Sequence, residues 1–215
     1  AVNYNRDVEI FPVLNAMFEK ISGESPYKSP TDMGVNMAGN CICDDEACRE
    51  ASRQEIIRRY YNSLNGLVYG SSTEDEVMKI ELIMKQAGIS KTDRKVVNTA
   101  LQRSEETEGP AAAMELNDGT IVTGKTTDLL GASAALLLNA LKVLAGIDHE
   151  KKVISPAAIR PIQKLKTEYL GSRNPRLHTD EVLIALSTSA ENNPDAQAAL
   201  DQLPKLAGCQ VHTSV

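Results

Sequence analysis

Apolar residues recur every three or four positions through most of the first half of the chain, a spacing typical of amphipathic helices. Asp7 and Asp44 stand where a helix N-cap favours a carboxylate. Thr73 and Glu76 have the spacing of a capping box. A Ser-Pro helix start at 29–32 is followed by glycines that keep any helix there short. The pattern predicts four longer helices, over residues 7–21, 44–67, 73–88 and 92–107.

The pattern changes after Pro110, where short runs of strand-forming residues appear. Residues 114–123 are interrupted by Asn117-Asp118-Gly119, and an Asp-Gly pair supplies the positive φ angles of a tight hairpin turn. This predicts a β-hairpin. Residues 127–145 are then apolar on nearly every side, which predicts a central buried helix.

The last third of the chain combines helical and strand signals. Helices are predicted over residues 155–170 and 193–208, each beginning near a proline. Residues 182–186 and 210–215 are predicted to be strands, and the helix between them would make a right-handed parallel β-α-β unit. The expected fold class is therefore α/β (α+β), with a helical region at 1–109 and an α+β region at 110–215. The two regions are expected to form one compact unit.

Charge and hydropathy exclude two classes of partner. The 215 residues include 23 Lys and Arg against 29 Asp and Glu, for a net charge of -6. Such a chain lacks the positive excess that binding to nucleic acid requires. No apolar run approaches the ~20 residues of a membrane span, and no signal peptide is recognised at the start. A cytoplasmic protein is expected.

The cysteines indicate reduced thiols. Cys41, Cys43 and Cys48 crowd together, and Cys209 lies far along the chain near His212. A zinc site built from these residues would have a C-x-C pair in place of the usual C-x2-4-C pair. No metal site is therefore predicted, and the sequence identifies no cofactor.

Residues 119–126 satisfy the phosphate-loop pattern G-x4-G-K-[ST]. The first glycine belongs to the predicted hairpin turn, and the four residues that follow it suit a strand better than a loop around phosphates. A weaker interpretation stays open. Lys125 and Thr126 lie where a strand meets a helix start, a place that favours anions.

Two polar stretches are further candidates for ligand binding. The first, residues 29–45, holds Asp32, Asn36 and Asn40, whose side chains suit a polar ligand but also cap helices and fill turns. The second, residues 171–180, is rich in chemically active side chains.

That second stretch joins two guanidinium groups to an imidazole and a carboxylate. Arg173 and Arg176 suit phosphate or carboxylate groups, and His178 with Asp180 could transfer protons near neutral pH. The alternative interpretation is a solvated loop with a capping histidine and surface ion pairs.

Long blocks of this sequence resemble a known family. The blocks are AVNYNRDVEIFPVL, SPTDMGVNMAGNC, DGTIVTGKTTDLLGASAALLLNALK and GSRNPRLHTDEVLIALS. They are similar to the bacterial domain-of-unknown-function family 1846, the uncharacterised protein family UPF 0371. The resemblance implies that the chain is the C-terminal part of a longer protein, whose missing N-terminal domain is Rossmann-like with its own glycine-rich loop. It implies no activity and no functional residues.

Three functions follow as hypotheses. The first is one wall of a cytosolic enzyme's cleft for a nucleotide or phosphorylated small molecule, with Lys125, Arg173 and Arg176 holding the anion. The second is a non-catalytic interaction module, forming a homo-oligomer through the apolar helix at 127–145. The third is a phosphate-loop hydrolase that acts through Lys125.

Overall fold

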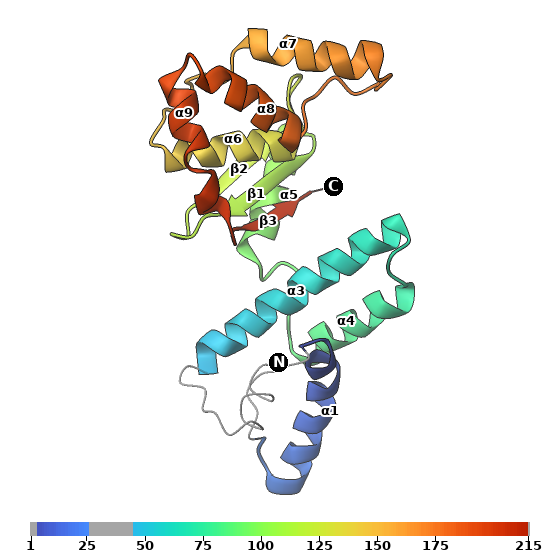
Figure 1. Ribbon diagram of the computed structural model, residues 1–215. Coiled ribbons are helices and arrows are strands. Elements are labelled where there is room, and N and C mark those ends of the chain that lie inside the picture. The colour runs from blue at the N-terminus through green and yellow to red at the C-terminus, as the bar shows by residue number, and fades with distance from the viewer. Residues whose placement is uncertain (1–3, 26–44, 215) are drawn as a thin grey trace. The chain divides into compact units, whose positions relative to one another are not determined.

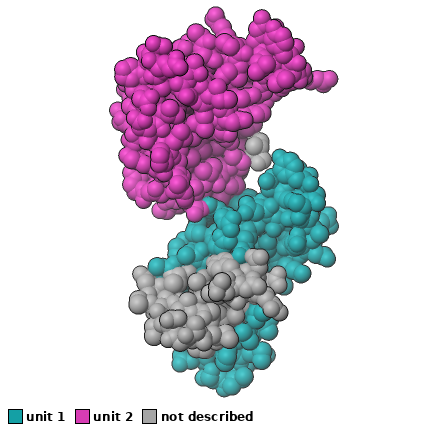
Figure 2. All heavy atoms as spheres, viewed as in Figure 1, with its two compact units in different colours: residues 1–94 teal, residues 95–215 magenta. Residues whose placement is uncertain are grey.

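The computed structural model describes residues 4–25 and 45–214 (Figure 1). Contacts divide the chain into two compact units, residues 1–94 and 95–215 (Figure 2). The helix that ends at Thr107 thus belongs to the second unit, whereas the sequence pattern placed it in the helical region 1–109. Each unit is described by itself below.

The first unit contains three helices among its described residues: α1 (Tyr4–Ser22), α3 (Asp45–Tyr69) and α4 (Glu74–Gln86). The turn between α3 and α4 makes the two helices a hairpin. The predicted capping box is confirmed, since Thr73 Oγ1 accepts from the Glu76 N–H and the Glu76 carboxylate accepts from the Thr73 N–H. A small core holds the two helices together. It is formed by apolar residues of α3 and α4 and by Ile89, shortly after the end of α4; its members are Ile56, Ile57, Tyr60, Val77, Ile83, Met84 and Ile89.

The second unit is built on a three-stranded sheet in the order β2-β1-β3. Strands β1 (Ala111–Glu115) and β2 (Ile121–Lys125) form the predicted antiparallel hairpin. Strand β3 (Gln210–Thr213) pairs with the other edge of β1, also antiparallel. The parallel β-α-β unit expected at the end of the chain is therefore wrong.

Helices cover both faces of this sheet. Side chains alternate across a strand, so Ala112 and Met114 pack toward α6 (Ala132–Leu144). Ala113 faces the opposite way, toward α5 (Lys95–Thr107). The expected α/β class is confirmed.

A further helical layer encloses the outer side of α6. It comprises α7 (Pro156–Lys164), the π-helix η1 (Leu165–Tyr169), α8 (Thr179–Ala190), α9 (Pro194–Leu200) and the short 3-10 helix η2 (Leu203–Leu206). Leu138 and Leu141 of α6 join the buried residues of α8 and α9 in one cluster. The apolar α6 is thus buried within its own unit, so the feature that suggested an oligomer has an internal explanation.

Residues 182–186 are helical, and the predicted strand there is wrong. They lie inside α8, where Val182, Ala185 and Leu186 are fully buried. A short apolar run has no periodicity that separates a buried strand from a buried helix. The spacing of the three buried residues, three and four positions apart, is that of one helix face.

The phosphate-loop match forms a hairpin instead. Gly119 has φ +83° in the turn, and residues 121–125 are strand β2. Gly124 is required by close packing, because a Cβ there would lie 2.2 Å from the Leu136 backbone nitrogen and 2.5 Å from its Cα. The strand pairs with β1, so these residues do not form a loop that wraps phosphates.

Candidate functional site

Two loops of the second unit, distant in sequence, lie side by side. One is residues 126–131, between β2 and α6, and the other is residues 171–178, between η1 and α8. Leu130 and Leu177 form a parallel bridge, in which the Leu177 N–H donates to the Leu129 carbonyl (2.8 Å) and the Gly131 N–H to the Leu177 carbonyl (3.1 Å). We call these two loops the loop pair. It joins two of the stretches in which the sequence predicted anion contacts.

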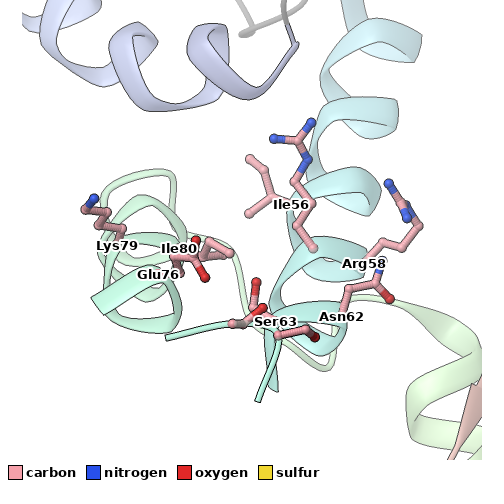
Figure 3. A pocket seen from close by; sticks show the side chains of 10 residues that line it. Ile56, Arg58, Asn62, Ser63, Glu76, Lys79 and Ile80 are labelled. Carbon is pink, nitrogen blue, oxygen red and sulfur yellow. The ribbon is translucent and has the colours of Figure 1, made fainter. Parts of the chain in front are cut away.

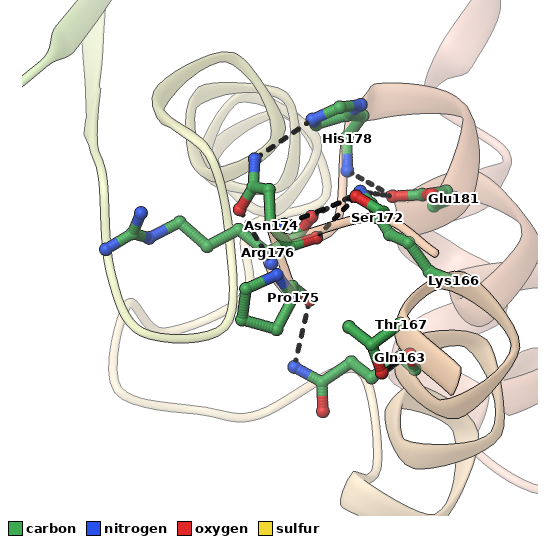
Figure 4. Close-up of polar contacts among 9 residues, drawn as sticks. All are labelled: Gln163, Lys166, Thr167, Ser172, Asn174, Pro175, Arg176, His178 and Glu181. Carbon is green, nitrogen blue, oxygen red and sulfur yellow. Dashed lines mark hydrogen bonds and ion pairs between the residues drawn. The ribbon is translucent and has the colours of Figure 1, made fainter. Parts of the chain in front are cut away.

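Arg176 connects the two loops through its side chain. Its Nε donates to the carbonyl of Thr127 at 2.8 Å. The hydroxyl of Thr127 in turn accepts from the N–H groups of Leu129 and Leu130, which shapes the first loop into a turn. The Arg176 side chain is otherwise exposed and extends over this turn (Figure 4).

A partly buried ion pair supports the second loop from below. Lys166 of η1 donates to the Arg176 carbonyl (2.7 Å) and to Glu181 Oε2 (2.8 Å). The same Glu181 oxygen accepts the N–H of His178 (2.7 Å). Burial alone would raise the pKa of Glu181, but the hydrogen bonds from Lys166 and His178 prevail and hold that pKa below its ordinary value. Glu181 therefore remains ionised at neutral pH.

Smaller contacts fix the rest of this loop (Figure 4). The Asn174 side chain accepts from the Arg176 N–H at 3.1 Å, and Ser172 Oγ accepts from the Asn174 N–H at 3.2 Å. Gln163 of α7 donates to the Pro175 carbonyl at 3.2 Å. With Leu177 fully buried, the loop is anchored both in the core and at its surface.

His178 and Asp180 both lie at the start of α8, and both are exposed. His178 is the N-cap residue, and its Nε2 lies 3.5 Å from Asn174 Nδ2. Asp180 is in the first turn. Among the described residues, no contact joins the imidazole to the Asp180 carboxylate.

The other predicted ligands of the second unit lie at or near the loop pair. Thr126 begins the first loop and is half-buried, and its N–H donates to the Pro110 carbonyl (2.9 Å). Lys125 precedes it at the end of β2 and is exposed. Arg173 lies in the second loop and is also exposed.

Asp32, Asn36 and Asn40 lie outside the described residues. Their role in binding a polar ligand therefore stays a prediction. Cys41 and Cys43 also lie outside, and Cys209 is half-buried, with its Sγ 3.8 Å from Asn117 Oδ1. Within residues 4–25 and 45–214, no group of three His, Cys, Asp or Glu side chains is arranged to hold a metal.

Sequence reasoning missed the residues that organise the loop pair. Lys166 resembles any other lysine of an amphipathic helix, and its inward position depends on the π-helix. Glu181 carried a readable signal, because a glutamate three positions after an N-cap residue is typical of a capping box.

A second polar surface, which the sequence pattern did not indicate, lies in the first unit. It is an open groove between α3 and α4, with a volume of about 480 Å³ (Figure 3). Arginines of α3 contribute to its lining, and their spacing of three and four positions from a glutamate is that of ordinary ion pairs on a helix surface.

The described architecture defines a class: an α/β protein whose first part is helical and whose second part is a sheet between helices. Two family models match the amino-acid sequence of the chain. They are the N-terminal domain of unknown function DUF1846, over residues 1–88, and the C-terminal domain of unknown function DUF1846, over residues 92–215. The chain belongs to the DUF1846 family, also called UPF0371.

Curated relatives agree with this assignment. A UPF0371 protein of Corynebacterium aurimucosum is 61% identical over 218 residues, and one of Corynebacterium glutamicum is 58% identical over 214 residues. A UPF0371 protein of Streptococcus thermophilus is 55% identical over 214 residues. Each match covers 99% or 100% of this chain but 43% of the relative. The chain thus spans less than half the length of these relatives.

The family match corrects one expectation. The N-terminal domain was expected to be missing from this chain, yet residues 1–88 match that domain's model. The helices of the first unit are therefore part of it. Within the part of the chain that the structure describes, no helix has the length and apolar character to cross a membrane.

Proposed function

We propose that the loop pair binds a nucleotide or a phosphorylated small molecule, as one wall of the cleft of a cytosolic enzyme. The observation that carries this proposal is the hydrogen bond from Arg176 Nε to the Thr127 carbonyl, which holds a guanidinium over the turn of the other loop. A guanidinium offers a planar fork of donors that matches phosphate oxygens. Lys125 and Arg173 would supply the further positive charges.

Order in the loops supports this proposal. A binding loop that is already fixed loses little conformational entropy when its ligand arrives. Here the Arg176 carbonyl, the His178 N–H and the Pro175 carbonyl are each held by a side chain of a neighbouring helix. These bonds use backbone groups, so the side chains of Arg176 and His178 remain directed to the surface.

His178 is the proposed acid-base group. An imidazole changes charge near neutral pH and can therefore accept or donate a proton beside a bound phosphate ester. Asp180 lies beside it in the first turn of α8. The proposal assigns the catalytic step to these two residues and the binding step to the arginines.

The test is ligand binding to the full chain by calorimetry, with ATP, AMP and ribose 5-phosphate as probes. Replacing both Arg173 and Arg176 with Gln removes two charges, and we expect affinity to fall at least about ten-fold, since charged hydrogen bonds contribute about 1.5–3 kcal/mol each. Arg160→Gln is the matched control, because Arg160 is an exposed arginine of α7 outside the loop pair.

Two results would overturn the proposal. One is that none of the three probes binds to the wild-type chain. The other is that the Arg173→Gln/Arg176→Gln variant binds as tightly as the Arg160→Gln control.

A further inference from the structure

We infer that η1 and the end of α7 form a dimer contact, at which the chain binds a second copy of itself about a two-fold axis. The surface consists of Lys164, Leu165, Glu168, Tyr169 and Leu170, and we call it the η1 face. It lies wholly within the second unit, and Figure 1 shows α7 along one side of that unit. This contact does not depend on ligand binding at the loop pair.

The polarity of η1 is inverted relative to that of an ordinary surface helix. Its lysine, Lys166, is buried, with 7% of its surface exposed. Its apolar residues are the exposed ones: Leu165 is 52% exposed and Tyr169 is 70% exposed, and Leu170, directly after η1, is 73% exposed. A surface helix normally buries its apolar residues and exposes its lysines. An exposed apolar patch beside polar residues is typical of a protein–protein contact.

The inner side of η1 explains why these apolar residues face outward. The Lys166 ammonium group donates to the Arg176 carbonyl (2.7 Å) and to Glu181 Oε2 (2.8 Å). Because Lys166 is held inward, Leu165 and Tyr169 are directed away from α8, and the described residues of the unit leave them exposed. A second copy covers them without displacing Lys166 from its acceptors.

The charges of the η1 face favour a second copy over a polyanion or an anionic membrane. Lys164 and Glu168 lie four positions apart, so the face carries one charge of each sign. Their ion pair within the chain is loose, with 3.8 Å between Lys164 Nζ and Glu168 Oε2, and both side chains are more than half exposed. Surface ion pairs of this kind contribute little to stability, so the two charges are free to exchange partners.

A two-fold axis makes this pattern of charges its own complement. In a two-fold contact both copies use the same surface, so residue i meets residue j and residue j meets residue i. When the two helical segments run antiparallel, Lys164 of each copy lies beside Glu168 of the other, and Leu165 lies beside Tyr169. Lys164 Nζ already lies 6.0 Å from the centre of the Tyr169 ring, a cation–π contact that loss of water strengthens.

The η1 face also gives a homo-oligomer a different origin from the one that the sequence indicated. The predicted oligomer was to form through the apolar helix at 127–145, but α6 is buried within its own unit. The exposed apolar residues of η1 supply what α6 does not, a surface that a second copy can reach.

The experiment is sedimentation equilibrium of the full chain over a wide range of protein concentration. The wild-type chain is expected to pass from monomer to dimer as its concentration rises. Replacing both Leu165 and Tyr169 with Ser should weaken dimerisation at least about ten-fold, because the apolar part of the contact is lost from both copies. Val143→Ser is the matched control and should dimerise as wild type does, since Val143 is a 50% exposed apolar residue of α6 outside the η1 face.

Charge reversal tests the two-fold arrangement itself. Lys164→Glu brings two carboxylates together at each symmetric position, and Glu168→Lys brings two ammonium groups together. Each variant alone should therefore dimerise at least about ten-fold more weakly. An equimolar mixture of the two variants should recover the dimer, because every charge pair across the axis is then opposite in sign. Both positions are exposed, so the circular dichroism spectra should match that of wild type.

The inference is overturned if the wild-type chain stays monomeric at every concentration, which would leave the η1 face to another partner. It is also overturned if the Leu165→Ser/Tyr169→Ser variant dimerises as the Val143→Ser control does. A dimer that tolerates either charge reversal alone, or a mixture of the two variants that recovers no dimer, would contradict the two-fold contact.

Discussion

The two units bury their apolar residues in different ways, and their polar groups differ accordingly. In the second unit, helices cover both faces of the sheet, and α6 is enclosed between the sheet and α8 and α9. In the first unit, a small core lies between α3 and α4, and the same two helices line an open groove. The polar residues of the second unit mostly fasten loops to this scaffold. Those of the first unit line a space.

The difference teaches that close packing and ligand access make opposite demands. A well-covered core fixes the backbone of its loops, as Leu177 fixes residues 171–178. Among the described residues of the first unit, polar side chains of α3 and α4 adjoin an open groove.

The largest expected effect comes from cutting into the enclosed core of the second unit. Leu141 of α6 is fully buried, and Leu141→Ala should lower the free energy of unfolding by about 3–5 kcal/mol. Leu82 of α4 is 56% exposed, so Leu82→Ala should cost less than about 0.5 kcal/mol. Urea unfolding followed by circular dichroism compares the two. Equal losses would mean that the packing contrast drawn here is false.

Two glycine replacements sharpen the comparison at the backbone level. In Gly124→Ala the new methyl group meets the backbone of α6, which must move, and a loss of about 2–3 kcal/mol is expected. In Gly66→Ala the methyl group meets the side chain of Ser72 instead. Its cost is offset by the ~1 kcal/mol that Ala gains over Gly in a helix.

The net change in Gly66→Ala should therefore stay below about 1 kcal/mol. Thermal unfolding of both variants, measured beside wild type, checks the order. A larger loss in Gly66→Ala than in Gly124→Ala would contradict it.

The smallest expected effect is the loss of stability at low pH that comes from one carboxylate in each unit. Glu55 and Glu181 both have pKa values below the usual 4.5, as described above, because hydrogen bonds from cations outweigh burial. Each therefore stabilises its unit above the usual pKa, and this contribution is lost as the pH falls through the lowered value. Because both side chains are partly exposed, each should contribute no more than about 1 kcal/mol.

The urea midpoints of unfolding at pH 7 and pH 3 measure how much each ionised carboxylate stabilises the protein. Glu55→Gln and Glu181→Gln should each be less stable than wild type at pH 7. The difference should shrink as the pH falls below the usual 4.5 towards 3. A constant difference at both pH values would remove the ionised carboxylate as the cause.

Local signals in the sequence predicted much of the fold. The capping box at Thr73 and the Asp-Gly turn of the hairpin depend on neighbours a few residues away, and both are confirmed. The run at 182–186 failed because tertiary burial, rather than local preference, decided between strand and helix. The pairing of β3 likewise depends on tertiary structure, because β3 joins the edge of β1 that β2 leaves open.

The candidate site was less accessible to such reasoning. Arg176 could be selected by residue type, but its partner Thr127 lies 49 residues earlier, and nothing local indicates that contact. Lys166 and Glu181 become important only when η1 and α8 are brought together. The groove was missed because its arginines follow the same spacing as ordinary surface ion pairs.

The π-helix η1 gives the second loop its particular orientation. Its five residues close with a bond from the Leu170 N–H to the Leu165 carbonyl at 3.0 Å, one residue more than an α-helical turn would span. That extra residue rotates the chain after η1 about the helix axis relative to α7. Deleting one residue of η1 after Lys166 would turn the following chain by about 100° about the helix axis. The ammonium group of Lys166 could then no longer reach both the Arg176 carbonyl and Glu181.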